Sequence, residues 1–217
     1  MTSPDRVHRG ALLAAVLFAA LPWVGCRKMS ELIEDESVGM NGGFEHARDG
    51  VPVNWLVYNS ETVKEGGDFD IILDTKDFKE GRQSLKFLIR ECSAIGGWHS
   101  PGIAREYPAL SGETYLISLW VKGEGSAYLV RIGGVDAWNG DYETVDSFDP
   151  ASDGWKLVEY EFTTPGEYET IRFELNALSP GSLWVDDVRI ELVDQGSSGR
   201  PTSGSQNRSD RRPAYTM

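Results

Sequence analysis

Apolar residues occupy every second position in several short segments between residues 38 and 193. In residues 84–90, for example, Leu85, Phe87 and Ile89 fall on one face of an extended chain. The same alternation recurs in residues 115–122, 128–132, 158–162, 171–175 and 184–192. Side chains of a β-strand point alternately to its two faces, whereas an amphipathic helix repeats every three to four residues. The pattern therefore predicts a body made of β-strands, without a long helix.

Turn-forming dipeptides separate these segments. They are Glu80-Gly81, Ser111-Gly112, Asp153-Gly154, Pro165-Gly166 and Pro180-Gly181. Glycine and proline at such points favour tight reversals of the chain. Short strands with one polar face each favour two antiparallel sheets packed face to face over a parallel sheet covered by helices. We therefore expect an all-β fold, a two-sheet antiparallel sandwich.

The chain begins with the pattern of an export signal. Basic residues near Arg6 precede an uncharged, mostly apolar run over residues 11–24, which is shorter than the ~20 residues of a spanning helix. Gly25-Cys26 then resembles the lipobox of bacterial lipoproteins, although Trp23 stands where Leu is usual. That resemblance implies that Cys26 is lipidated and becomes the first residue. The alternatives are an ordinary secretory signal and an uncleaved anchor.

These features divide the chain into four parts. They are a signal peptide of lipoprotein type (1–25), a charged tether (26–37), a folded domain (38–194) and a disordered tail (195–217). The tail is rich in Ser, Gly and Arg, so it buries too little apolar surface to offset the entropy of ordering. With Cys26 acylated, Cys92 has no partner, and we expect no intramolecular disulfide.

Charge narrows the classes of partner. The chain has 217 residues, of which 40% are hydrophobic, enough for one domain with tails. Residues 29–195 hold 13 basic and 32 acidic side chains, a net charge of −19. So acidic a body repels nucleic-acid phosphates and suits divalent cations or neutral polar ligands. We therefore expect no nucleic-acid partner.

A series of short motifs carries a family resemblance. In chain order they are Asn41-Gly-Gly-Phe-Glu45, Pro52-Val-Asn-Trp55, Glu80-Gly-Arg-Gln-Ser-Leu85, Ser111-Gly-Glu-Thr-Tyr115, Gly154-Trp155 and Gly181-Ser-Leu-Trp-Val-Asp-Asp-Val188. Their order and spacing resemble the CenC-type carbohydrate-binding modules, grouped with carbohydrate-binding families 4, 9, 16 and 22. The resemblance implies a jelly-roll sandwich of the galactose-binding type and a non-catalytic, carbohydrate-binding function.

The resemblance also implies a structural calcium ion. Its ligands would be the Gly43 carbonyl, the carboxylates of Glu45 and Asp186, and groups of the 74–80 loop, where Asp74 and Asp77 are candidates. By alternation Asp186 shares the face of Trp184, Val188 and Ile190, and a buried carboxylate needs a cation or hydrogen-bond donors. The alternative is that Glu45 and Asp186 cap turns or pair with Arg or Lys.

Aromatic residues outside the expected core suggest a sugar-binding site. Flat aromatic rings stack on the apolar faces of sugars, and polar groups bind their edges. The candidates are Trp98, Trp138, Tyr142, Trp120 and Arg131. We expect Trp120 and Arg131 to line a groove across one sheet, together with Arg90, Arg172 and Glu174, and Trp98 and Trp138 to stand at its rim. Trp55, Trp155 and Trp184 are expected in the core.

Catalysis has little support in the sequence. No GxSxG, HExxH or P-loop pattern occurs, and acidic pairs arise by chance in so acidic a body. The first hypothesis is a monomeric, non-catalytic glycan-binding module, exported and anchored to a membrane of the cell envelope through Cys26. The second is an exported adaptor that binds a protein partner, since one fold serves many functions. The third is a small glycan-cleaving hydrolase.

Overall fold

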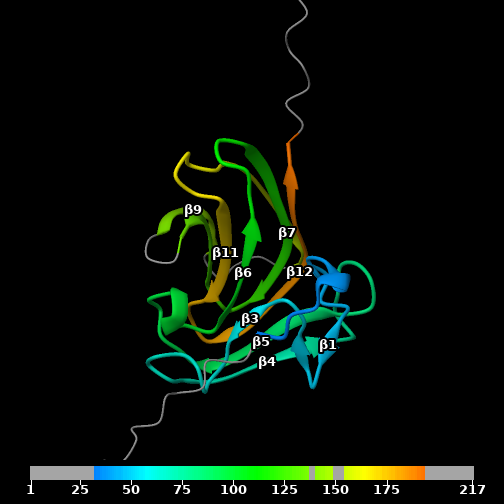
Figure 1. The fold of residues 1–217 in the computed structure, drawn as a ribbon. Coiled ribbons are helices and arrows are strands. Elements are labelled where there is room, and N and C mark those ends of the chain that lie inside the picture. The colour runs from blue at the N-terminus through cyan, green and yellow to red at the C-terminus, as the bar shows by residue number, and fades with distance from the viewer. Residues whose placement is uncertain (1–31, 137–139, 149–153, 194–217) are drawn as a thin grey trace, which may run out of the picture.

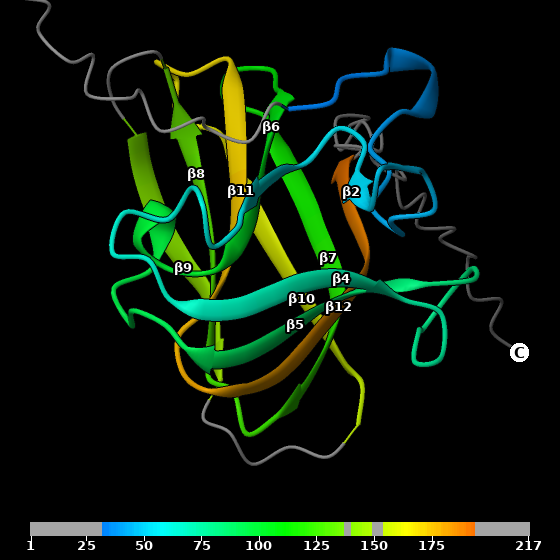
Figure 2. The ribbon, with the colours of Figure 1, turned by 90° about the horizontal axis from the view of Figure 1, so that it is seen from below.

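The computed structural model describes residues 32–136, 140–148 and 154–193. Within them, twelve strands form two five-stranded antiparallel sheets and one short two-stranded sheet. Sheet I has the order β10-β7-β12-β5-β4 and sheet II the order β3-β6-β11-β8-β9. The sheets pack face to face as two layers (Figures 1 and 2). The predicted all-β sandwich is therefore confirmed.

The strands run as follows. Sheet I contains β4 (Asp68–Asp74), β5 (Ser84–Glu91), β7 (Thr114–Glu124), β10 (Lys156–Thr163) and β12 (Gly181–Leu192). Sheet II contains β3 (Leu56–Tyr58), β6 (Gly102–Pro108), β8 (Tyr128–Val135), β9 (Gly140–Phe148) and β11 (Thr170–Ala177). The short sheet pairs β1 (Ala47–Arg48) with β2 (Val51–Pro52), and two 3-10 turns, η1 (Glu36–Val38) and η2 (Gly97–His99), complete the described elements. None of the helices in this part of the chain has the length and apolarity needed to cross a membrane.

The core lies between the two sheets and follows the alternation of the sequence. Leu85, Phe87 and Ile89 of β5 all point inward and are buried. Ile132 of β8 and Phe173 of β11 meet them from sheet II and are also buried. Full burial of such a side chain contributes about 1.5–3 kcal/mol. The period-two prediction therefore located the strands that carry most of the core.

The alternation missed four strands of the two large sheets: β4 at an edge of sheet I, β6 within sheet II, and β3 and β9 at the two edges of sheet II. The β9 strand, at one edge, carries a charged or polar side chain at most positions, and β3, at the other, has three residues. An edge strand with exposed, charged side chains resists pairing with other chains. Such a strand has no apolar stripe for a pattern to detect.

The face that Asp186 occupies differs in part from the expectation. Asp186 pairs with Trp120, so it shares a face of sheet I with Trp184, as predicted, but this is the outer face and not the core-facing one that the sequence indicated. The register then shifts, and Asp187 has a φ of 50°. This bulge turns Val188 and Ile190 to the core, where both are buried. The prediction that they share the face of Asp186 is wrong, because an extra residue in a strand reverses the faces beyond it.

The N-terminal segment lies against β12, and both views show it beside that strand (Figures 1 and 2). The Val188 amide donates a hydrogen bond to the Gly42 carbonyl (3.1 Å). A Cβ added at Gly42 would lie 1.7 Å from the Val188 carbonyl oxygen. Only glycine permits so close an approach of two backbones.

Candidate functional site

Six polar side chains share the outer face of sheet II and are called here the polar face; two of them, Tyr58 and Glu174, are buried. They are Tyr58, Glu106, Arg131, Tyr142, Arg172 and Glu174. Strand register brings them together: Arg172 lies opposite Glu106 on one side, and Glu174 lies opposite Arg131 on the other. Five strands, β3, β6, β8, β9 and β11, thus place outward-facing residues on one face of the sheet.

Ion pairs hold the polar face in a fixed arrangement. Arg131 Nη2 lies 3.0 Å from Glu174 Oε2, and the Glu174 side chain is only 4% exposed. Arg172 Nη1 lies 2.8 Å from Glu106 Oε1, and Arg172 Nη2 donates to the Tyr58 hydroxyl at 2.5 Å. Charge-assisted hydrogen bonds of this kind are the strong ones in proteins. The two arginines and two glutamates therefore form a neutral, organised set.

The pKa values of Tyr58 and Arg172 are shifted by burial and by their charged neighbours. The pKa of Tyr58 is raised to about 12, by burial first and then by the negative charge of Glu174. Burial opposes the positive charge of Arg172, but its neighbours Tyr58, Tyr142 and Glu174 outweigh this effect and raise its pKa. The phenol stays neutral and the guanidinium stays charged at physiological pH.

Tyr142 lies flat against the backbone of the sheet. A Cβ added at Gly133 would lie 2.9 Å from Tyr142 Cδ1, and one added at Gly140 would lie 2.6 Å from Cε2. The two glycines therefore make room for the ring. The Arg131 guanidinium carbon is 5.4 Å from the centroid of the Tyr142 ring. Tyr142 is 38% exposed. The arrangement presents an aromatic surface to solvent beside an arginine.

Trp98 lies at one end of the polar face. The preceding residue, Gly97, exchanges two hydrogen bonds with the buried Asn176 side chain of β11, at 2.8 and 2.9 Å. A Cβ added at Gly97 would lie 3.1 Å from Arg131 Nη2. Trp98 itself is 58% exposed. The structure therefore places the Gly97–His99 turn, which carries Trp98, next to Arg131.

Trp120 lies on the other sheet. It belongs to β7 of sheet I, whereas Arg131 belongs to β8 of sheet II. Lys79 Nζ sits 3.9 Å from the centroid of the Trp120 ring. The expectation of one groove lined by Trp120 and Arg131 is wrong, because alternation shows which residues share a strand face but not which sheet the strand joins. Arg90 is also in sheet I, where it pairs with Asp68 and Asp70.

The sequence named four members of the polar face and missed two. Arg131, Arg172, Tyr142 and Glu174 were candidates, but Tyr58 and Glu106 were not. No local pattern marks the last two, since each reaches the site only through the pairing of β3 with β6 and of β6 with β11. Trp138, the other expected rim residue, and Cys26 lie outside the described residues.

Three of the five expected metal ligands come together. A Cβ added at Gly43 would lie 3.8 Å from both Asp186 Oδ1 and Glu45 Cγ. Glu45 accepts hydrogen bonds from the Arg82 amide (2.7 Å) and the Arg82 Nε (3.0 Å). These donors and the Gln83 amide outweigh burial and lower the pKa of Glu45.

Asp186 is the buried member of this group, at 0% exposure. Its carboxylate accepts from the amides of Lys79 (2.7 Å), Glu80 (3.0 Å) and Asp187 (2.8 Å). Burial nevertheless raises its pKa, so the environment leaves its negative charge incompletely compensated. No group of three acidic, histidine or cysteine side chains that could hold a metal occurs in the described ranges. A cation here would depend largely on backbone carbonyls.

The other two expected ligands serve different partners. Asp74 accepts from the Trp184 indole at 2.9 Å and lies 3.6 Å from Lys86 Nζ. Asp77 accepts from Lys122 Nζ at 2.6 Å and from the Trp155 indole at 3.1 Å. These bonds fasten the β4–β5 loop over the outer face of sheet I. The structure does not bring Asp74 and Asp77 into the group around Gly43.

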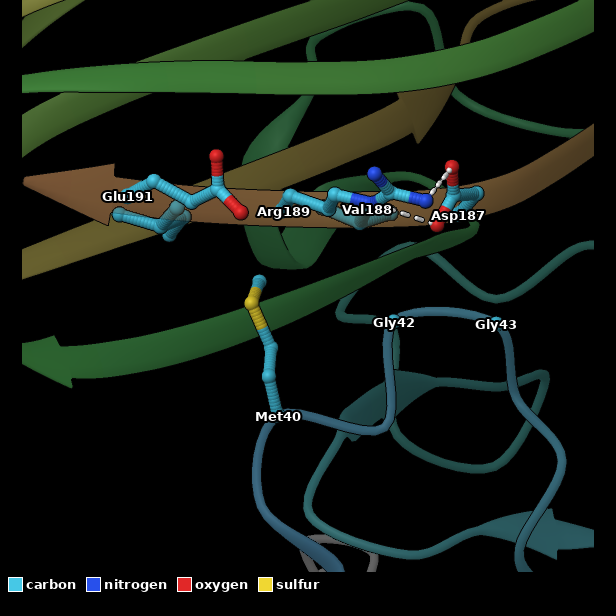
Figure 3. Close-up of a pocket in the computed structure, with 8 residues that line it drawn as sticks. Met40, Gly42, Gly43, Asp187, Val188, Arg189 and Glu191 are labelled. Carbon is cyan, nitrogen blue, oxygen red and sulfur yellow. Dashed lines mark hydrogen bonds and ion pairs between the residues drawn. The ribbon is translucent and has the colours of Figure 1, made fainter.

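An open hollow of about 270 Å³ lies beside that group, between the N-terminal segment and β12 (Figure 3). Met40, Gly42 and Gly43 line one side, and residues 187–191 line the other. Three charged side chains line it: Arg189 and Asp187, which pair with each other at 2.7 Å, and Glu191. The hollow therefore offers an approach to the Gly43 bend.

The fold is shared with known carbohydrate-binding modules. The C-terminal family 22 carbohydrate-binding module of Clostridium thermocellum Xyn10B matches at 14% identity and a TM-score of 0.50, over 70% of this chain and 90% of that one. A structure described as CBM4 matches at 17% identity and 0.50, over 70% of this chain and 98% of that one. These likenesses confirm the predicted jelly-roll fold.

Some of the matching structures are much longer than this chain. The enzymatically active domain of tailspike protein 4 of bacteriophage CBA120 matches at 12% identity and a TM-score of 0.53, over 70% of this chain. The present chain spans 21% of that tailspike chain, and 26% of a Clostridium thermocellum xylanase chain that joins a family 22 module to a GH10 module. No protein-family model and no curated protein matches this sequence.

Proposed function

We propose that this protein is a non-catalytic module that binds a carbohydrate chain on the polar face of sheet II. The observation that carries the proposal is the flat, partly exposed Tyr142 ring beside Arg131. The apolar C–H face of a sugar can stack on such a ring while its hydroxyls bond to neighbouring polar groups. The groups for that purpose are already fixed by ion pairs, so binding orders few side chains.

The charge balance favours a neutral ligand. The cations Arg131 and Arg172 are paired with Glu174 and Glu106, respectively. Glu106 is 57% exposed and keeps oxygens that sugar hydroxyls can bond. An anionic ligand would have to compete with these carboxylates for the arginines. A chain of neutral sugars, with donors and acceptors on each ring, suits the arrangement better.

Fold likeness provides the first ligand to test. One structure with the same fold, matching at 14% identity and a TM-score of 0.50, is described as a xylan-binding domain. We propose xylan as the first probe among soluble polysaccharides. Stacking on one or two rings supports only a modest affinity, on the order of μM to mM.

Isothermal titration calorimetry tests this proposal. The wild-type protein is titrated with xylan, mixed-linkage glucan, mannan and galactan. The Arg172→Met variant is then titrated with the same polysaccharides. We expect one of these polymers to bind and the Arg172→Met substitution to weaken it. The Arg90→Met variant, which removes a similar ion-paired arginine from sheet I, is the matched control. Absence of heat with every polymer would refute glycan binding on this surface.

We also propose that a calcium ion stiffens the sandwich at the Gly43 bend. The Gly43 carbonyl and the carboxylates of Glu45 and Asp186 would hold it, completed by water. Calcium takes six to eight oxygen ligands and accepts backbone carbonyls readily. The raised pKa of Asp186 supports the proposal, because a nearby cation would relieve an unfavourable buried charge.

Thermal unfolding with calcium and with excess chelator tests the metal. We expect a lower melting temperature with chelator for wild type, and no difference for Asp186→Asn. The control is Asp74→Asn, which alters a carboxylate of the same sheet outside the group and should keep the calcium response. A wild-type melting temperature that chelator leaves unchanged would overturn the metal proposal.

We propose that the protein is exported and held on a membrane through lipidated Cys26. The apolar run and the cysteine of the first 26 residues support this. A single acyl chain binds a membrane only marginally, whereas several on one residue anchor a protein stably. Mass spectrometry of the membrane-extracted protein should find an acylated Cys26 at the N-terminus, and Cys26→Ser should move the protein to the soluble fraction. An unmodified N-terminus upstream of Cys26 would exclude this processing.

A further inference from the structure

The segment that carries Trp98 is fastened on two sides. On the side of the sheet, the Asn176 side chain binds both the amide and the carbonyl of Gly97. On the other side, the loop between β3 and β4 provides two contacts. The Lys64 amide donates to the Trp98 carbonyl at 3.1 Å, and Glu65 Oε1 and Oε2 lie 2.6 and 2.7 Å from His99 Nδ1.

Two neighbours also define the plane of the Trp98 indole. Lys64 Nζ lies 5.4 Å from the ring centroid. The His99 ring meets the indole edge to face, with centroids 5.2 Å apart and an interplanar angle of 72°. Even so, Trp98 is 58% exposed. An exposed side chain ordinarily exchanges rotamers within nanoseconds, so these contacts matter for a ring that would otherwise be mobile.

We propose that Glu65 is a positioning residue for the polar face. By pairing with His99, it orders Trp98 as a second stacking platform next to the Arg131–Glu174 pair. The inference rests on the proposed glycan binding. Glu65 acts through His99 and Trp98 and need not touch the ligand. A platform ordered before binding spares the complex the entropy of fixing it, and affinity rises accordingly.

The effect of Glu65 on Trp98 can be tested without unfolding the domain. Its side chain is 36% exposed, and His99 is the partner it holds. Exposed pairs of this kind contribute little to global stability. The backbone of the Trp98 segment, in contrast, is secured by the fully buried Asn176. Removing the Glu65 charge should therefore release the indole and leave the sandwich intact.

Fluorine NMR of protein labelled with 5-fluorotryptophan measures the indole directly, without any ligand. The Trp98 signal is the one that Trp98→Phe removes. In Glu65→Gln we expect this signal to shift or broaden while the other tryptophan signals keep their positions, which also shows that the fold is intact. Glu61→Gln, the same charge change in the same loop, is the control and should leave it in place. His99→Gln removes the other partner of the Glu65–His99 pair and should reproduce the effect on the Trp98 signal.

Affinity for xylohexaose, measured in parallel, tests the link to binding. We expect Glu65→Gln to weaken binding three- to tenfold in the wild-type background and to have no effect when Trp98 is already alanine. An unmoved Trp98 signal in both Glu65→Gln and His99→Gln, or an equal loss of affinity with and without Trp98, would overturn the inference. If wild type binds no glycan, the proposed function fails, while the ligand-free NMR signal still decides whether Glu65 holds the indole.

Discussion

Replacing Tyr142 with alanine should remove the stacking platform while leaving the polar groups of the site in place. The ring lies on Gly133 and Gly140, and the guanidinium carbon of Arg131 is 5.4 Å from its centroid. The ion pairs Arg131–Glu174 and Arg172–Glu106 do not involve it. The substitution therefore separates the contribution of the aromatic surface from that of the hydrogen-bonding groups.

The exposed area of Tyr142 sets the size of the effect. An aromatic side chain has roughly 200 Å² to bury, and 38% of Tyr142 is exposed. Covering that surface with the apolar face of a sugar removes roughly 75 Å² from water, which at about 25 cal/mol per Å² stabilises the complex by about 2 kcal/mol. Since 1.4 kcal/mol is tenfold in affinity, we expect Tyr142→Ala to weaken binding roughly 25-fold.

Calorimetric titration with the best-binding polysaccharide measures this loss. Tyr142→Phe keeps the ring and should retain most of the affinity. Leu157→Ala, which removes a residue of similar exposure from the outer face of sheet I, should have no effect. Thermal unfolding of each variant confirms that the fold is retained.

Two outcomes would refute this reasoning. If Tyr142→Ala binds as tightly as wild type, the ring is not a platform, and the ligand lies elsewhere. If Leu157→Ala weakens binding as much as Tyr142→Ala does, the outer face of sheet I takes part, and the assignment to sheet II is wrong.

Three further predictions follow from the same contacts. The pKa of Tyr58 is raised to about 12 in the folded chain from an ordinary value of 10.0, so the neutral phenol's contribution to stability should be complete below about pH 10 and decline as the pH rises through 12. Urea unfolding of wild type should show this decline. A decline of the same size in Tyr58→Phe would contradict the prediction. Gly42→Ala places a Cβ 1.7 Å from the Val188 carbonyl oxygen and should destabilise the folded chain by about 1–3 kcal/mol in urea unfolding. Gly43→Ala, whose Cβ meets nothing nearer than 3.8 Å, should leave the stability unchanged. Equal stability of the two variants would argue against the close backbone contact at Gly42. Glu174→Gln removes the buried carboxylate that pairs with Arg131. It should lower both glycan affinity and melting temperature, because the Arg131 guanidinium loses a charge-assisted hydrogen bond that holds it in place. An unchanged melting temperature would show that Arg131 does not depend on the pair.

Local alternation was enough to predict the strands of the core, because the two faces of a strand differ in burial. Leu85, Phe87 and Ile89 occupy the interior as the pattern indicated. The same logic placed Asp186 beside Trp184 on one face. It failed two residues later at the bulge around Asp187, since nothing in a period-two pattern signals an inserted residue.

The sequence by itself determined that residues 38–193 form a β-sandwich, and it named Arg131, Tyr142 and Trp98 as candidates for the site. The tertiary structure decided which of them meet. Trp120 and Arg131 both point away from the core, yet strand pairing puts them on different sheets. Tyr58 and Glu106 reach the polar face from β3 and β6. The physical reason is range: burial of alternate side chains is a local property of a strand, whereas sheet order and register depend on contacts between segments far apart in the chain.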